Sequence, residues 1–211
     1  MSGNQHDDLA PDMPTDRRLL RGVRTRSAVL RRAVDLASLD GLDGLSFGRV
    51  ATDTGLSKAG VQTLFRTKEI LQLAAVEHAR ALFIEAVVDP ARTEASGVAR
   101  LRALVENWIV YAETPLFLGG CFRAANMTEF DSRPGTVRDA LLRDQRDWRT
   151  LLANHFRHAA AAGDIADLDP ELAAFQLDAV LLAANTALRL GDSGVTDQVR
   201  RILDDMLRPA G

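Results

Sequence analysis

The chain has 211 residues, of which 46% are hydrophobic and 26% charged, and its single cysteine excludes a disulfide framework or a thiolate zinc site. This composition is typical of a globular protein, and the excess of Ala, Leu and Arg over β-branched and aromatic residues favours helices. No apolar run is long enough to cross a bilayer and the acidic start does not resemble a signal peptide, so we expect a cytoplasmic protein without a membrane partner.

The net charge of −3 hides an uneven distribution. Residues 1–16 carry four acidic and no basic residues, residues 17–68 carry eleven Lys or Arg against four acidic residues, and residues 69–211 carry fifteen against twenty-one. A basic segment joined to an acidic body is expected of a small nucleic-acid-binding module on a larger domain. An Arg-rich, solvated helix surface is the alternative explanation.

The first third of the chain predicts a tail followed by helices. Residues 1–16 show no apolar periodicity and predict a disordered tail. A helix follows over about 23–40, then a short helix between Ser46 and Gly55 and a third after Ser57, because serine caps a helix start and glycine ends a helix. A fourth helix over about 68–88 is expected to end before proline, since the residue preceding proline disfavours helical geometry.

The two short helices are spaced as in a helix-turn-helix. Ala51 is small enough for two helices to cross, and Gly55 allows the sharp turn between them. Four apolar residues would hold the helices together: Val50, Leu56, Val61 and Leu64. The residues between these anchors would then face the major groove, namely Lys58, Gln62 and Thr63. Gln62 can pair with adenine, and Lys58 with guanine or phosphate.

These residues resemble the DNA-binding domain of the TetR family of regulators. The resemblance spans about residues 24–75 and rests on Leu45-Ser46-Phe47 through Ala51, Gly55-Leu56-Ser57-Lys58, Val61-Gln62-Thr63-Leu64-Phe65 and Thr67-Lys68-Glu69. It implies a homodimer that binds a double-stranded, palindromic operator and is released by a small-molecule effector, without a cofactor. Gln62 stands where the family often has tyrosine, and Leu64 where it often has histidine.

The resemblance also implies roles for individual residues. Ser46 and Arg49 would hold phosphates at the second helix, and Lys68 would clamp phosphate at the start of the fourth. The residues expected to bind DNA are therefore Arg24, Ser46, Arg49, Ser57, Lys58, Gln62, Thr63 and Lys68. Arg24 belongs to an arginine-rich arm with Arg17, Arg18 and Arg21, which could follow the DNA backbone or enter the minor groove, or could be a disordered surface segment.

The rest of the chain predicts further helices and no strand. They are expected over about 94–112, 121–130, 136–162, 170–190 and 195–207. We therefore predict an all-α protein of about nine helices, with a helix-turn-helix domain at residues 17–67 and an effector-binding and dimerisation domain at residues 68–211.

An effector pocket is expected where aromatic and amide side chains interrupt the aliphatic helices of the second domain. The candidate lining residues are Trp108, Tyr111, Phe117, Cys121, Phe122, Asn126, Trp148, Phe156 and Asn185. Residues 115–122 include two glycines and could form a wall or gate of this pocket. Cys121 could be a redox sensor or an inert buried residue, and Arg123 could pair with an anionic effector or be a surface charge.

The last two helices predict the dimer interface. The helix over about 170–190 is apolar on nearly every face, so it must be covered on all sides, and a second copy of the chain could supply part of the cover. The helix over about 195–207 adds an apolar stripe that includes Val199, Ile202 and Leu203. Together the two helices could form a four-helix interface.

Two other functions are considered. A helical enzyme or metal protein could use His155 and His158, which lie three residues apart, but further ligands and catalytic motifs are missing, so we expect neither catalytic residues nor a metal. A helical ligand-binding or interaction protein without DNA binding is the other alternative, and the basic segment argues against it.

Overall fold

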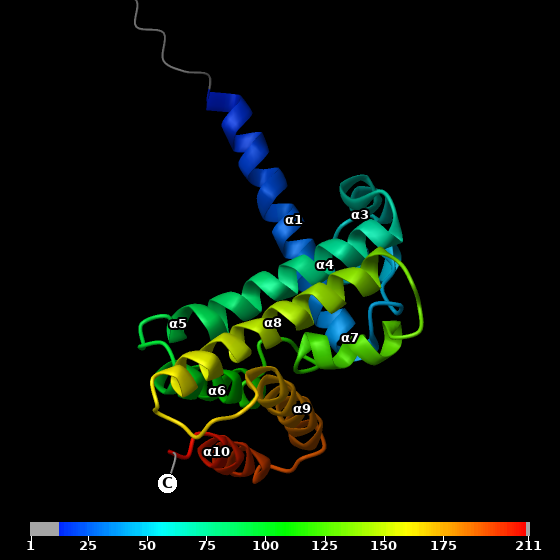
Figure 1. Cartoon of the computed structure of the whole chain (residues 1–211). Helices are drawn as coiled ribbons and strands as arrows, with labels where there is room; N and C mark the ends of the chain where they lie inside the picture. Colours follow the sequence, from blue (N-terminus) through cyan, green and yellow to red (C-terminus); the bar gives the residue numbers. More distant parts are fainter. Residues whose placement is uncertain (1–12, 210–211) are drawn as a thin grey trace, which may run out of the picture.

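The computed structural model describes residues 13–209, and within this range the chain is helical with no strand (Figure 1). The elements are α1 (Met13–Asp40), α2 (Phe47–Thr54), α3 (Lys58–Phe65), α4 (Lys68–Phe83), the π-helical η1 (Ile84–Val88), α5 (Asp89–Ala91), α6 (Val98–Glu113), α7 (Phe122–Phe130), α8 (Thr136–Ala161), α9 (Pro170–Arg189) and α10 (Val195–Met206). In the described range, nine helices have eight or more residues, which confirms the expected fold class.

Local capping signals set the boundaries of the short helices. The side chains of Ser46, Ser57 and Thr67 each accept a hydrogen bond from the backbone N–H three residues later, at the starts of α2, α3 and α4. Gly55 follows α2 with a φ of 68°, a left-handed conformation that favours glycine. The predicted helix-turn-helix therefore forms at the expected residues.

Helix α1 begins at Met13 rather than near Val23, which corrects the expected tail boundary. Residues 13–16 belong to this helix, and the remaining residues of the expected tail, 1–12, lie outside the described residues. Pro14 fits here because the first turn of a helix needs no backbone N–H donor. The first part of α1 extends away from the body (Figure 1), so the expected arginine arm is helical.

Helix α4 continues past the point where we expected it to end. Its last turns widen into η1, in which the N–H of Asp89 bonds to the carbonyl of Ile84, and α5 then includes Pro90. Proline normally breaks a helix because its ring meets the carbonyl four residues earlier. The wider π turn shifts that hydrogen-bond register, which explains why the predicted stop before Pro90 was wrong.

The helix-turn-helix and the C-terminal helices share one continuous core. Helix α4 contacts α1, α3 and α8, and α8 also contacts α6, α7 and α9. The guanidinium of Arg26 lies 4.4 Å from the centre of the Phe65 ring and donates to the carbonyl of Leu64 at 3.0 Å, fastening α3 to α1. Helix α3 is thus fixed to α1, which also contacts α4 and α7.

Helix α9 corrects the expectation that no apolar segment is long enough for a membrane. Among the described helices, it alone reaches the length and composition of a membrane span. In the fold it packs against α8 and α10 (Figure 1), and core helices of globular proteins pass the same test. The segment therefore gives only weak evidence for a membrane span.

Candidate functional site

The outer face of α3 carries the side chains that we expected to read DNA. Lys58, Gln62 and Thr63 are exposed, whereas Val61 and Phe65 on the other face are fully buried. The Thr63 hydroxyl donates to the carbonyl of Ala59 at 2.8 Å, so its methyl group and the lone pairs of its oxygen remain to meet a partner. This face can enter a groove without unfolding the core beneath it.

The expected phosphate-binding cations differ in how they are held. Lys68 Nζ donates to the backbone carbonyl of Asp43 at 2.6 Å and lies 3.2 Å from its carboxylate. Arg49 forms an ion pair with Asp40, while Arg24 is exposed on α1. Ser46 and Ser57 are occupied as helix caps. A DNA phosphate that binds Lys68 or Arg49 would therefore displace the acidic partner of that side chain or share the side chain with it.

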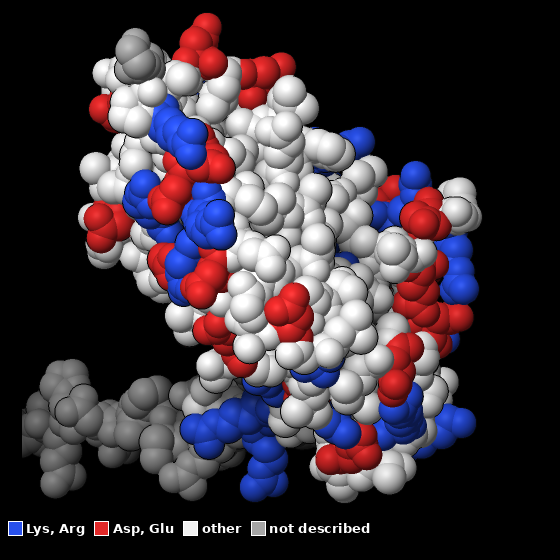
Figure 2. Space-filling view, turned by 90° about the horizontal axis from the view of Figure 1, so that it is seen from below, with Lys and Arg blue, Asp and Glu red and all other residues white. Residues whose placement is uncertain are grey.

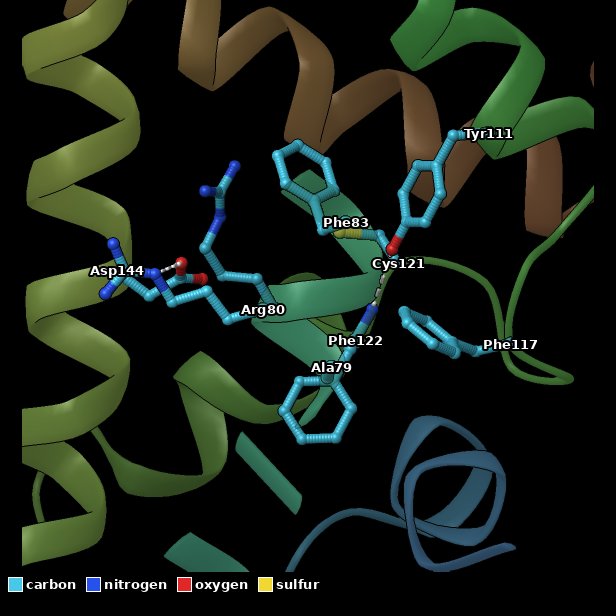
Figure 3. Close-up of a pocket in the computed structure, with 9 residues that line it drawn as sticks. Ala79, Arg80, Phe83, Tyr111, Phe117, Cys121, Phe122 and Asp144 are labelled. Atoms are coloured by element: carbon cyan, nitrogen blue, oxygen red, sulfur yellow. Dashed lines mark hydrogen bonds and ion pairs between the residues drawn. The ribbon is translucent and has the colours of Figure 1, made fainter. Parts of the chain in front are cut away.

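A small cavity lies between α4, α6, α7 and α8 (Figure 3). Its lining residues are Ala79, Arg80, Phe83, Tyr111, Phe117, Cys121, Phe122, Arg123 and Asp144. The cavity volume is about 10 Å³, which is enough for one water molecule. The Tyr111 hydroxyl points at the start of α7 and accepts a hydrogen bond from the N–H of Phe122 at 3.3 Å.

A larger and more open pocket of about 210 Å³ lies on the other side of Phe83. It is lined by Arg80, Phe83, Ile84, Val88, Arg92, Asp144, Asp147, Trp148 and Leu151. The Phe83 ring makes edge-to-face contacts with Tyr111 and with Trp148, each at 5.3 Å between ring centres. Phe83 lines both the inner cavity and the outer pocket, as do Arg80 and Asp144.

The structure brings together five of the nine candidate pocket residues. Tyr111, Phe117, Cys121 and Phe122 line the inner cavity, and Trp148 lines the outer pocket. Trp108 and Phe156 lie in the core, and neither they nor the two amides, Asn126 and Asn185, line these spaces.

Both amide side chains form hydrogen bonds with backbone groups instead. The Asn126 side chain accepts from the N–H of Leu42 at 2.7 Å and donates to the carbonyls of Phe122 at 2.7 Å and Ala37 at 3.3 Å. Asn185 accepts from the N–H of Cys121 at 3.0 Å. Both polar atoms of the Asn126 side chain and the oxygen of Asn185 are therefore already used inside the protein.

The sequence reasoning missed a buried charged cluster beside the cavity. Arg123 and Asp178 form an ion pair at 3.1 Å, with side chains only 6% and 4% exposed. Burial raises the pKa of the neighbouring Asp144, while Arg123 and Arg80 act in the opposite direction. Burial also raises the pKa of Tyr111, so its hydroxyl stays neutral. The signal in the sequence was Asp178, a charge inside the apolar helix α9.

The histidine pair considered as a metal site has local partners. The Nδ1 atom of His155 lies 3.1 Å from the Ser96 hydroxyl, and that of His158 lies 2.6 Å from the carbonyl of Asn154. Within residues 13–209, no three His, Cys, Asp or Glu side chains gather in a way that could hold a metal ion.

The turn between α1 and α2 joins the helix-turn-helix to the C-terminal body. Besides the bond from Leu42 to Asn126, the N–H of Asp43 donates to the Glu129 carboxylate at 3.2 Å, and the Asp43 carboxylate pairs with Arg133 at 3.1 Å. Asn126 and Glu129 both lie on α7, whose first turn lines the cavity. Helix α7 thus contacts both regions.

Apolar side chains remain exposed on the last two helices. Leu172 and Phe175 of α9 are 53% and 51% exposed, and Ile202 of α10 is 37% exposed. On the side where α9 and α10 lie, the surface shows a broad area without charge between groups of acidic and basic side chains (Figure 2). Val199 and Leu203 of α10 face the core of their own chain.

Comparisons with known proteins agree with this architecture. Residues 97–203 match the family model described as the tetracyclin repressor-like, C-terminal domain. A TetR transcriptional regulator from Chloroflexus aurantiacus is similar in structure over 90% of this chain and 100% of its own, at 23% identity and a TM-score of 0.80. No curated protein is similar enough in sequence to count as a relative.

Two further similar structures were solved with ligands. AibR, in complex with isovaleryl coenzyme A and operator DNA, matches over 89% of this chain and 100% of its own, at 23% identity and a TM-score of 0.73. A transcriptional regulator from Saccharomonospora viridis in complex with choline matches over 87% and 95%, at 22% identity and a TM-score of 0.73. From the helix-turn-helix, the fold and the matched C-terminal domain together, the chain belongs to the TetR family of DNA-binding transcriptional regulators.

Proposed function

We propose that this regulator binds a palindromic operator as a homodimer, represses transcription there, and is released when a small molecule occupies the spaces beside Phe83. The observation that carries the proposal is the course of α4. This helix begins at the Lys68 clamp and ends at Ala79, Arg80 and Phe83, which line the inner cavity. One rigid element therefore connects the DNA contacts to the ligand site.

In this proposal, Lys58, Gln62 and Thr63 meet base edges, and the cations around them meet phosphates. Arg24, Arg49 and Lys68, together with the N-termini capped by Ser46 and Ser57, would hold the backbone. We place the boundary of the DNA-binding domain at residues 67 and 68, where Thr67 caps α4. A protein that binds operator DNA works where the DNA is, so we also propose a cytoplasmic location. Since DNA binding and its release by ligand need no covalent bond to be made or broken, we further propose no enzymatic activity.

The dimer would form through α9 and α10. The exposed Leu172, Phe175 and Ile202 are large apolar side chains that gain free energy when a second copy covers them. A two-fold axis that runs along the length of the protomers would place the two copies of α3 on one side of the dimer. Their spacing must match half-sites about 34 Å apart, or a multiple of that distance.

Release requires that the ligand prefers the DNA-incompetent conformation. A nearly complete population shift needs a difference of about 5 kcal/mol between its affinities for the two states. Two elements can transmit the conformational change from the ligand site to the DNA-binding domain. One is α4, through Lys68, and the other is α7, through Asn126 and Glu129 at the turn that precedes α2. A tilt of either helix would change the spacing of the two α3 helices.

The first test is selection of genomic fragments by the purified protein, followed by titration of the enriched sequence at several salt concentrations. We expect a palindrome, a steep decrease in affinity with salt, and weaker binding by Gln62→Ala. Absence of any enriched sequence, with weak binding throughout, would contradict specific operator recognition.

A second test concerns release. Cross-linking the two α4 helices of a dimer at their DNA-bound spacing should abolish the response to ligand while preserving DNA binding. A normal response in the cross-linked dimer would exclude α4 as the lever.

A further inference from the structure

Two buried donors beside the cavity have no acceptor. In the described part of the chain, the buried side-chain nitrogen atoms that lack a hydrogen-bond partner are Arg123 Nε and Trp148 Nε1. Arg123 is 6% exposed and Trp148 is 4% exposed, so bulk solvent does not compensate for the missing bonds. Buried polar groups are nearly always paired because an unpaired one costs free energy. Both groups are N–H donors, so the missing partner is an acceptor.

The two donors belong to one site. The guanidinium carbon of Arg123 lies 5.8 Å from the centre of the Trp148 ring and 5.9 Å from that of Phe83. Arg123 lines the inner cavity, Trp148 lines the outer pocket, and Phe83 lines both, together with Arg80 and Asp144. A displacement of the Phe83 ring would join the two spaces into one aromatic-walled site lined by both Arg123 and Trp148.

The surrounding charges decide which kind of acceptor fits. Arg123 is already paired with Asp178, and Arg80 lies 3.6 Å from Asp144 and 2.7 Å from Asp147. The two cations thus face three carboxylates, so an added carboxylate would be repelled and would stay unbalanced in a poorly solvated site. A cation would bring no acceptor. A neutral acceptor pairs the donors without adding charge.

We propose that the site binds an uncharged aromatic or aliphatic molecule with a carbonyl oxygen, which accepts hydrogen bonds from Arg123 Nε and Trp148 Nε1. This inference rests on the proposed function and names the chemical class of the effector. The ring or chain of the ligand takes the place that Phe83 occupies between Tyr111 and Trp148. Since Phe83 is the last residue of α4 before η1, ligand entry acts directly on the helix that leads to Lys68.

The experiment measures calorimetric affinities of the full-length protein for four naphthalenes of similar size. These are methyl naphthyl ketone, its isostere isopropenylnaphthalene, naphthoate and naphthylethylamine. We expect the ketone to bind about ten-fold more tightly than the isostere, since the isostere leaves buried donors unpaired. Naphthoate and the amine should bind more weakly than the ketone by a similar factor.

Two variants test the assigned donors. Trp148→Phe keeps an aromatic ring against Phe83 but removes the N–H, and Arg123→Lys keeps the charge beside Asp178 but removes Nε. Each should lower the ratio of ketone to isostere affinity several-fold, since the isostere accepts a hydrogen bond from neither donor. Trp108→Phe is the matched control, because Trp108 is buried in the core and lines neither space, and it should preserve the ratio.

Equal affinity for ketone and isostere, a preference for naphthoate or the amine, no measurable binding of any of the four, or an unchanged ratio in both variants would overturn the proposal. Operator binding by the same preparations is measured in parallel without ligand. A protein that binds its operator but fails the ligand series leaves DNA recognition in place and removes only the ligand assignment. Loss of operator binding itself would count against the proposed function instead.

Discussion

Helix α3 presents Lys58 and Gln62 to solvent, whereas the cavity region holds Arg123 and Asp178 buried against each other between α7 and α9. In the first region the polar side chains lie outside a small apolar core and are not needed to form it. In the second, the polar groups are part of the core, and Arg123 and Asp178 are already paired with each other. Substitutions on α3 should therefore change binding alone, while substitutions in the body should change stability and function together.

The turn between α1 and α2 and the loop before α7 lie where the two regions meet. Here Ser38, Leu42 and Asp43 of the first region bond to Gly119, Asn126 and Glu129 of the second. We call these contacts the seam. A change in the seam affects both regions, so it tests most directly whether the exposed region and the buried region respond differently to substitution.

Gly119→Ala should give the largest effect. A Cβ at this position would lie 1.9 Å from the carbonyl oxygen of Ser38 and 2.1 Å from its carbonyl carbon, which are backbone atoms of α1. Because the backbone of α1 or the backbone at residue 119 would have to move to make room, we expect a loss of about 3 kcal/mol in the free energy of unfolding, measured by urea denaturation.

The control for that substitution is Gly22→Ala, which lies within α1 and has nothing within 4 Å of the added Cβ. It should be neutral or raise the stability by up to about 1 kcal/mol, since alanine favours helix. Equal unfolding free energies for the two variants would show that the seam is not tightly packed.

Asn126→Ala should have the next largest effect. It leaves the buried N–H of Leu42 without an acceptor and removes the bond to the Ala37 carbonyl. We expect a loss of about 2 kcal/mol in unfolding free energy. Asn154→Ala on exposed α8 surface should stay within about 0.5 kcal/mol of the native protein. An equally small loss of unfolding free energy for Asn126→Ala would mean that α4, and not Asn126, holds the helix-turn-helix to the C-terminal body.

The same residues explain what could be predicted from the sequence. Ser46, Gly55 and Ser57 act on neighbours within a few positions, so their pattern predicted the helix-turn-helix correctly. Asn126 was assigned to a ligand pocket because an amide in an apolar helix indicates a polar partner, but the partner is backbone 84 residues away along the chain. Nothing local in the sequence distinguishes such a partner from a ligand.

The charged cluster and the continuation of the helical run from α4 through η1 to α5, which includes Pro90, depend on tertiary structure in the same way. Arg123 and Asp178 are 55 residues apart, and only the packing of α7 against α9 brings them together. The π turn in η1 requires a neighbouring element to hold it, and α6 supplies that contact. Sequence reasoning thus located the aromatic side of the cavity but not its charges.

Gln62→Ala tests the exposed region. We expect about ten-fold weaker operator binding, with reduced discrimination at the contacted base, because a bidentate pair with adenine is lost. The unfolding free energy should stay within about 0.5 kcal/mol of the native value, since Gln62 is exposed. A marked loss of stability would contradict the contrast between the two regions.

Asp43→Asn should give the smallest effect, present at neutral pH and fading as the pH becomes acidic. Hydrogen bonds from Arg133 and Lys68 hold the pKa of the Asp43 carboxyl below its usual 3.8. Its contribution to stability is therefore complete above about pH 4 and is lost as the pH falls through the lower, folded-state pKa. Urea unfolding of both proteins from neutral pH to about pH 3 should show a slightly steeper loss in the native protein. Parallel curves would mean that the exposed pairs with Lys68 and Arg133 contribute nothing to the seam, and that buried bonds such as that of Asn126 hold it alone.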